Sequence, residues 1–173
     1  MSRYFPHTAY AEDQPLAKTI LTTHVETRAI PTGTIIGAGI FATREAIQRL
    51  RKTATPSTAA AVPRSHLFLR AAGQSTLWII GIISIGLVAR MWGREEIEWK
   101  DRSWRLMENK GQLETDDWTY GGMVAGLAAT ALLKRPVGWV AALGSVGTGS
   151  VAGTLGYVAW RYGIHGGKRP ELE

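Results

Sequence analysis

The sequence predicts an all-α membrane protein built from about four short, glycine-rich transmembrane helices and an amphipathic connecting helix. The clearest sign is the segment Pro136–Trp160, which carries no charged residue over a length sufficient to cross a bilayer as a helix. Apolar residues gather in four blocks with charged residues between them, although the mean hydropathy of the whole chain is only −0.04. The third sign is the 20 glycines among 173 residues, which fall inside the apolar blocks and would let helices pack closely.

Four spans are expected within a single domain. They lie near 29–46, 71–91, 118–133 and 137–160 and form a transmembrane domain over 29–163, between a polar N-terminal tail, 1–28, and a C-terminal tail, 164–173. Pro31 suits the first turn of the first span, where a helix needs no N–H donor. The second span has the most apolar centre, and the third and fourth form a tight hairpin.

The segments that connect the spans differ in composition. Residues 44–70 are rich in Lys and Arg, lack a clear periodicity and are expected to form an extended loop. Residues 93–117 place Ile97, Trp104 and Met107 on one helical face, which predicts the amphipathic connecting helix. This helix would lie on the membrane surface or on a partner, and a solvated surface helix with half-buried apolar residues is an equally good interpretation.

Two of the uncharged runs are shorter than a usual span, so buried helices of a soluble protein are the alternative interpretation. The length of the fourth run, the Lys and Arg residues that flank each block, and the aromatic residues near the block ends favour the membrane. Lys and Arg are concentrated in the first and third connections. The positive-inside rule therefore predicts that these connections lie on one face and that both termini lie on the other.

Small residues recur four positions apart in three of the spans, which places them on one face of each helix. We expect them to form close helix-packing interfaces, either among the chain's own helices or with a partner. The residues concerned are Gly33, Gly37, Gly122, Gly126, Ser145, Gly149 and Gly153.

Charged residues next to the spans suggest two further kinds of contact. Arg49, Arg51 and Lys52 are candidates for binding an anionic lipid such as cardiolipin. Nucleic acid is disfavoured as a partner, because the positive charges are divided among several loops. Asp116 and Asp117 lie at the expected entrance of the third span, where they would cap the helix or complement its dipole; a salt bridge to an Arg of a partner is the alternative.

The sequence assembles no recognisable catalytic or cofactor site. The absence of Cys excludes thiolate zinc sites and cysteine nucleophiles, and the four histidines lack the spacing of metal ligands. Gly147, Gly149 and Ala152 match a variant of the dinucleotide fingerprint, but they lie inside the long uncharged run and not in a βαβ unit. We therefore expect no catalytic residue, no metal, no cofactor and no small-molecule substrate.

The stretch Glu114–Gly163 resembles a known family. It combines an acidic pair, an aromatic residue and a Gly–Gly pair with a hairpin rich in small residues, carried by Asp116, Asp117, Tyr120, Gly121, Gly122 and Gly126. This pattern is similar to the mitochondrial Tim-type superfamily, which contains channel subunits of the inner-membrane preprotein translocase and a membrane-arm accessory subunit of respiratory complex I. The loop signature of the translocase type is missing after the second span, so the complex I subunit is the closer likeness.

The resemblance implies a non-catalytic accessory subunit of mitochondrial complex I, a multi-pass protein of the inner membrane that stabilises the membrane arm by helix packing. Its partners would be other membrane subunits and phospholipid, and its termini would lie in the intermembrane space. The N-terminal residues form neither a secretory signal nor a cleavable mitochondrial presequence, which fits internal targeting. A translocase subunit and an assembly factor are the alternatives.

Overall fold

The computed structural model describes residues 4–51, 62–132 and 138–167. These residues form five α-helices, which are α1 (Ala17–Leu50), α2 (Arg64–Met91), α3 (Glu96–Glu108), α4 (Lys110–Ala131) and α5 (Trp139–Val158). A short 3₁₀ turn, η1 (Ala11–Asp13), precedes them, and a π-helical turn, η2 (Ala159–Ile164), follows α5. The predicted all-α class is thus confirmed for the described part of the chain.

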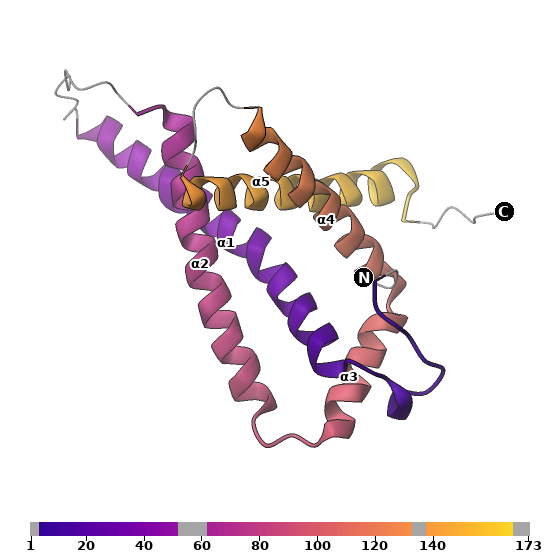
Figure 1. Cartoon of the computed structure of the whole chain (residues 1–173). Coiled ribbons are helices and arrows are strands. Elements are labelled where there is room, and N and C mark those ends of the chain that lie inside the picture. The colour runs from indigo at the N-terminus through magenta and orange to yellow at the C-terminus, as the bar shows by residue number, and fades with distance from the viewer. Residues whose placement is uncertain (1–3, 52–61, 133–137, 168–173) are drawn as a thin grey trace.

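Helix α5 lies at the centre of the arrangement. Figure 1 shows α1 and α2 side by side, with α5 running across them and α4 crossing α5. Helix α3 packs on the N-terminal part of α1, close to the N-terminal segment of the chain. Because α5 contacts α1, α2 and α4, the glycine-rich helix links the pair α1–α2 to α4.

Helices α1 and α2 form an antiparallel pair. At one end Ser84 Oγ donates a hydrogen bond to Glu26 Oε1 over 2.6 Å, and near the other end the rings of Phe41 and Phe68 meet edge to face with centroids 5.7 Å apart. Between them Gly33 and Gly37 of α1 face the backbone of α2. The pair is therefore held by small residues at its centre and by larger side chains towards its ends.

The amphipathic connecting helix is present as α3, and the chain itself covers part of its apolar face. Met107 is buried against Ile20 of α1 and Leu113 of α4. The Trp104 indole N–H donates to the Thr8 carbonyl oxygen over 2.9 Å, which ties α3 to the N-terminal segment. Exposed Ile97 lies near the other end of the helix.

Helix α1 is longer than the predicted first span, because it begins at Ala17 and includes residues 17–28 of the predicted polar tail. The prediction that Pro31 lies in the first turn was wrong, since Pro31 lies in the helix interior. The cause is tertiary, because this polar stretch finds partners elsewhere: Ile20 packs in the cluster with α3, and His24 bonds to α4. Such contacts override the local preference of Pro for a helix start.

Helix α4 also begins earlier than the predicted third span. Asn109 caps it by accepting a hydrogen bond from the Gln112 backbone N–H over 3.1 Å, directly after α3 ends. Asp116 and Asp117 consequently lie inside α4, so the prediction that they cap a helix at its entrance was wrong. A side chain that accepts from the free N–H groups of a first turn defines a helix start more strongly than the change in hydropathy at Trp118.

The predicted loop over 44–70 is shorter than expected, because helix α1 continues to Leu50 and α2 starts at Arg64. Residues 52–61 of that loop lie outside the described residues, as do the ends of the predicted spans at 133 and 137 and most of the predicted C-terminal tail. Helix α5, over 139–158, matches the predicted fourth span closely.

Among the described helices, α2 alone combines the length and the apolar composition of a membrane span. Its most apolar 18-residue window has a mean hydropathy of 1.7. The 22 residues of α4 and the 20 of α5 extend over about 30 Å each. Many of those residues are Gly, Ala, Ser and Thr, which lower mean hydropathy without adding charge.

Candidate functional site

Helices α4 and α5 cross with their backbones in direct contact. Here Gly122 and Gly149 face each other, and a Cβ added to either would overlap the carbonyl oxygen of the other. One turn along, a Cβ on Gly126 would overlap the carbonyl oxygen of Ser145, whose hydroxyl donates to the Gly126 carbonyl over 2.8 Å. Gly153 lies against the Trp118 carbonyl at the far end. The two backbones therefore touch directly over two turns.

The crossing of α1 and α2 uses the same principle. A Cβ on Gly33 would lie 2.5 Å from the Thr76 Cα, and a Cβ on Gly37 would lie 2.6 Å from the Ala72 Cα. Since real Cβ contacts are longer, no side chain fits at either position without separating the helices. The structure thus places all seven small residues singled out from the sequence at crossings between helices of this chain.

A second small-residue face on α5 did not emerge from the sequence. Ala141, Gly144, Gly147 and Ser150 follow one another at intervals of three and are all buried. A Cβ on Gly144 would overlap the Leu69 carbonyl of α2, and a Cβ on Gly147 would overlap the hydroxyl of Thr34 in α1. The i, i+3 spacing was a usable signal, because residues three apart share a helix face as residues four apart do.

Hydroxyl groups supplement the contacts between glycines. Thr119 of α4 and Thr154 of α5 are 2.9 Å apart through their Oγ1 atoms, and each hydroxyl also bonds to a carbonyl of its own helix. Between α1 and α2, Thr34 and Thr76 lie 3.3 Å apart. These bonds satisfy polar side chains in places where the close approach of the helices excludes solvent.

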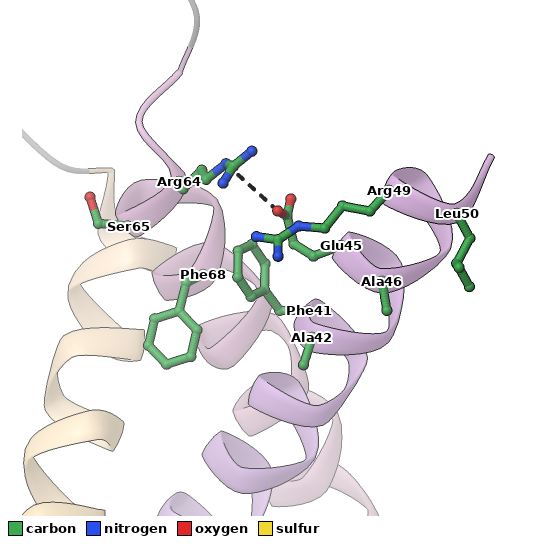
Figure 2. Close-up of a pocket in the computed structure, with 9 residues that line it drawn as sticks. All are labelled: Phe41, Ala42, Glu45, Ala46, Arg49, Leu50, Arg64, Ser65 and Phe68. Carbon is green, nitrogen blue, oxygen red and sulfur yellow. Dashed lines mark ion pairs between the residues drawn. The ribbon is translucent and has the colours of Figure 1, made fainter. Parts of the chain in front are cut away.

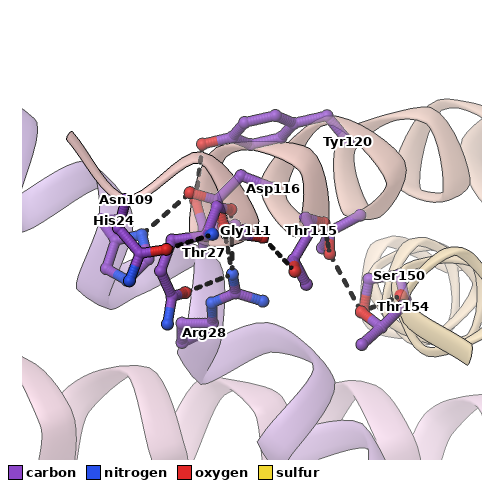
Figure 3. Close-up of polar contacts among 12 residues, drawn as sticks. His24, Thr27, Arg28, Asn109, Gly111, Thr115, Asp116, Tyr120, Ser150 and Thr154 are labelled. Carbon is purple, nitrogen blue, oxygen red and sulfur yellow. Dashed lines mark hydrogen bonds and ion pairs between the residues drawn. The ribbon is translucent and has the colours of Figure 1, made fainter. Parts of the chain in front are cut away.

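A buried ion-pair network joins α1 to α4. The Asp116 carboxylate is fully buried and lies 2.7 Å from Arg28 Nη2 through Oδ1, while Oδ2 accepts from His24 Nδ1 over 2.9 Å (Figure 3). Arg28 also donates to the side-chain oxygen of Gln112 over 3.0 Å. An ionised carboxylate without these partners would be strongly unfavourable in such a place. The network therefore fixes which face of α1 meets α4.

A third hydroxyl pair lies beside the ion-pair network. The Tyr120 and Thr27 hydroxyl oxygens lie 2.8 Å apart, with Thr27 also donating to the Thr23 carbonyl (Figure 3). Asp116 has its ionic partners within the chain, so it needs no partner Arg for neutralisation, while Asp117 is half-buried at the next position. The sequence did not predict the ion pair between Arg28 and Asp116, because the two residues lie in helices far apart along the chain and no local pattern relates them.

A third polar contact joins the start of α4 to the end of α5. Glu114 Oε2 accepts from the Tyr157 hydroxyl over 3.0 Å and from Arg161 Nη1 over 3.1 Å. The ring of Trp118 lies beside that of Trp160, with centroids 5.8 Å apart. This aromatic and ionic cluster closes the end of the α4–α5 crossing opposite to Gly126.

The residues proposed to contact lipid lie at the opposite end of the pair α1–α2. Arg49 is in the last turn of α1 and lines a groove between α1 and α2, and Arg51 follows the helix end. Lys52 lies outside the described residues. The structure thus brings Arg49 close to Arg64 of α2, which the sequence did not link to it.

Within the described ranges no three His, Asp or Glu side chains converge in a way that would hold a metal ion. What the arrangement offers chemically is close packing, ion pairing and apolar surface. No protein-family model matches this sequence. No curated protein matches it either.

Proposed function

We propose that this chain is a multi-pass membrane protein with a structural role, a non-catalytic subunit that stabilises a larger membrane complex by helix packing. The supporting observation is the exposure of its most apolar helix. Only 17 % of the most apolar window of α2 is buried, and Trp78, Ile82 and Ile85 are 75 %, 59 % and 72 % exposed. The core helix of a soluble protein would bury such residues, since their contact with water is unfavourable.

The outward faces of the other helices agree with this proposal. Ile35 on α1, Val124 on α4 and Leu155 on α5 are each more than half exposed. The inward faces carry glycine and hydroxyl residues, and helices that associate within lipid are packed in this way. Large apolar side chains outside and small ones inside reverse the pattern of a soluble helical bundle, and lipid or neighbouring helices would cover the outside.

The polar groups between the helices fit the same environment. Buried Asp116 is paired with Arg28 and His24, as a charged residue within a membrane domain must be. One end of the pair α1–α2 carries Arg44, Arg49, Arg64 and Arg70, whereas Lys18, Arg28 and Arg90 lie towards the other end. We assign the end with the four arginines to the positive-inside face, the matrix side of the inner membrane, with the chain termini on the other side.

The specific complex that we propose is mitochondrial respiratory complex I, in its membrane arm. This step rests on the resemblance carried by Glu114–Gly163, which spans α4 and α5. An accessory subunit there needs no catalytic residue and no cofactor, because redox chemistry and proton pumping belong to other subunits. Other membrane subunits and phospholipid, including cardiolipin, are the partners that this role implies.

A translocase channel is less well supported. A channel needs polar groups free to face a passing segment or water, whereas the candidate hydroxyls in α4 and α5 donate to backbone carbonyls. Ser145 donates to Gly126 across the helix pair; Thr130, Thr148, Ser150 and Thr154 each donate within their own helix. Because each of these hydroxyls already donates its proton to a carbonyl oxygen, none has a donor free for a passing segment.

The experiment that tests the proposal is purification from mitochondria in mild detergent through a C-terminal tag, followed by native electrophoresis and identification of co-migrating proteins. Stoichiometric co-migration with an NADH-oxidising complex is the expected result. Migration with presequence-binding proteins would favour the translocase, and transient association with incomplete complexes would favour an assembly factor. Release of the protein by alkaline carbonate would refute the membrane assignment itself.

A further inference from the structure

A groove lies between the last turns of α1 and the first turns of α2, at the cationic end of the molecule. It has a volume of about 730 Å³ and is lined by Phe41, Glu45, Arg49, Leu50, Arg64 and Phe68, together with small residues (Figure 2). We call it the α1–α2 groove. Its volume falls within the roughly 300–1,000 Å³ typical of small-molecule sites.

The groove has an apolar floor and a charged mouth. The rings of Phe41 and Phe68 form the floor, in edge-to-face contact with centroids 5.7 Å apart. At the mouth the Arg64 guanidinium lies 3.6 Å from the Glu45 carboxylate, and Figure 2 shows the Arg49 guanidinium pointing back over Phe41 towards Glu45. Two cations and one anion thus surround an opening that leads to apolar surface.

The local charge favours an anionic ligand. Glu45 is the sole acidic residue between positions 44 and 70, a stretch that also contains Arg44, Arg51 and Arg70. The Glu45–Arg64 pair is long for a charge-assisted contact, and Arg64 is 73 % exposed. A phosphate can therefore approach Arg64 without first breaking a tight, buried ion pair.

We propose that the α1–α2 groove binds one anionic phospholipid, with its phosphate between Arg49 and Arg64 and one acyl chain lying over Phe41 and Phe68. This rests on the proposed membrane location, because the groove lies where α2 enters its apolar stretch and where headgroups would meet the protein. A phospholipid supplies an anion and an apolar chain in one molecule. A neighbouring helix would have to bring both an acidic residue and a slender apolar face to the same opening.

The test uses the full chain reconstituted into vesicles that contain phosphatidylglycerol with a photoactivatable diazirine in one acyl chain. After irradiation, mass spectrometry of peptides measures labelling around Phe41 and Phe68. We expect strong labelling there, and much weaker labelling with the matching phosphatidylcholine probe. The double variant Arg49→Gln/Arg64→Gln should reduce phosphatidylglycerol labelling by roughly 25-fold, since each arginine near the surface contributes about fivefold.

Three further variants test whether labelling depends on the charge at the groove, on the free volume of the groove and on a correctly folded protein. Arg94→Gln/Arg105→Gln, just before and within α3, removes two exposed, paired arginines and is the matched control, which should leave labelling unchanged. Ala46→Trp fills the groove without altering charge and should abolish labelling. Glu45→Gln removes the competing anion and should increase labelling about fivefold, a gain that a misfolded variant would not produce.

Equal labelling by the two probes, or unchanged labelling in the double variant and in Ala46→Trp, would overturn the lipid site. Transfer of label to a co-purified protein would assign the groove to a partner subunit and would overturn it as well. These failures differ from failure of the membrane proposal. In that case the chain would not enter vesicles at all, and carbonate would extract it.

Discussion

Replacing Gly149 by Leu tests the packing of the fold most directly. The glycine lies on α5 where the backbone of α4 is closest, and a Cβ there would overlap the Gly122 carbonyl oxygen and lie 3.0 Å from the Gly126 Cα. Both neighbouring atoms belong to the backbone of α4, so they cannot move aside as the end of a flexible side chain could. A leucine therefore forces α4 and α5 apart.

The size of the effect follows from what separation removes. Overpacking a well-packed site costs about 1–3 kcal/mol. Separation also breaks the hydrogen bonds from Ser145 to the Gly126 carbonyl and between Thr119 and Thr154, at about 1 kcal/mol each. The better helix propensity of leucine offsets about 0.8 kcal/mol. The expected net loss is about 2–4 kcal/mol of unfolding free energy.

The assay is unfolding of the purified chain in detergent micelles, followed by far-ultraviolet circular dichroism and tryptophan fluorescence. The matched control is Gly121→Leu, since Gly121 is exposed on α4 and a Cβ there meets no atom within 4 Å. This control should cause no loss of stability and should gain up to about 0.8 kcal/mol from the helix propensity of leucine. Equal losses in both variants, or a Gly149→Leu protein as stable as the parent, would refute the packing argument.

Three other perturbations follow from the structure. Asp116→Ala removes the carboxylate that pairs with Arg28 and should cost about 3–5 kcal/mol in the same unfolding assay. The double change Arg28→Met/Asp116→Leu should recover most of that loss, and failure to recover it would show that the charges themselves are needed. Ile82→Asp places a charge on the outer face of α2 and should make the free energy of inserting this helix into the membrane less favourable by about 2.5–3.5 kcal/mol. Carbonate extraction would show this as a smaller membrane fraction, and an unchanged membrane fraction would argue against α2 as a span. Trp104→Phe removes the hydrogen bond to Thr8 and should increase proteolysis of the N-terminal segment at little cost in global stability, whereas an unchanged cleavage rate would contradict its anchoring role.

Local patterns in the sequence predicted the helices but not their ends. The uncharged run of α5 gave bounds close to the observed 139–158, because the whole helix lies in one apolar block. The polar first third of α1, residues 17–28, falls in the predicted tail, because nothing local indicates that Ile20 will meet Met107 or that His24 will meet Asp116. Contacts between residues so distant in sequence depend on the fold, and helix ends that depend on them cannot be derived from hydropathy alone.

The sequence also predicted which small residues pack closely, but only on one face of α5. The spacing of four found Ser145, Gly149 and Gly153, which face α4. The spacing of three, which includes Gly144 and Gly147, marks the face that meets α2 and α1. A helix with two such faces is packed from both sides, and this property indicates a central element even before its neighbours are known.

Because α5 packs against other helices on two faces, the position of a partner's binding surface is restricted. The small residues of α5 are already in contact with α1, α2 and α4, so the glycine stripe leaves no backbone groove for a neighbouring subunit. A variant such as Gly149→Leu would then remove the chain from a complex by disturbing its own fold. Residues that contact a partner directly must instead be sought among the outward apolar side chains, such as Ile85 of α2 and Val124 of α4. Changes there should alter assembly while leaving the unfolding free energy of the isolated chain nearly constant, because those side chains touch little of it.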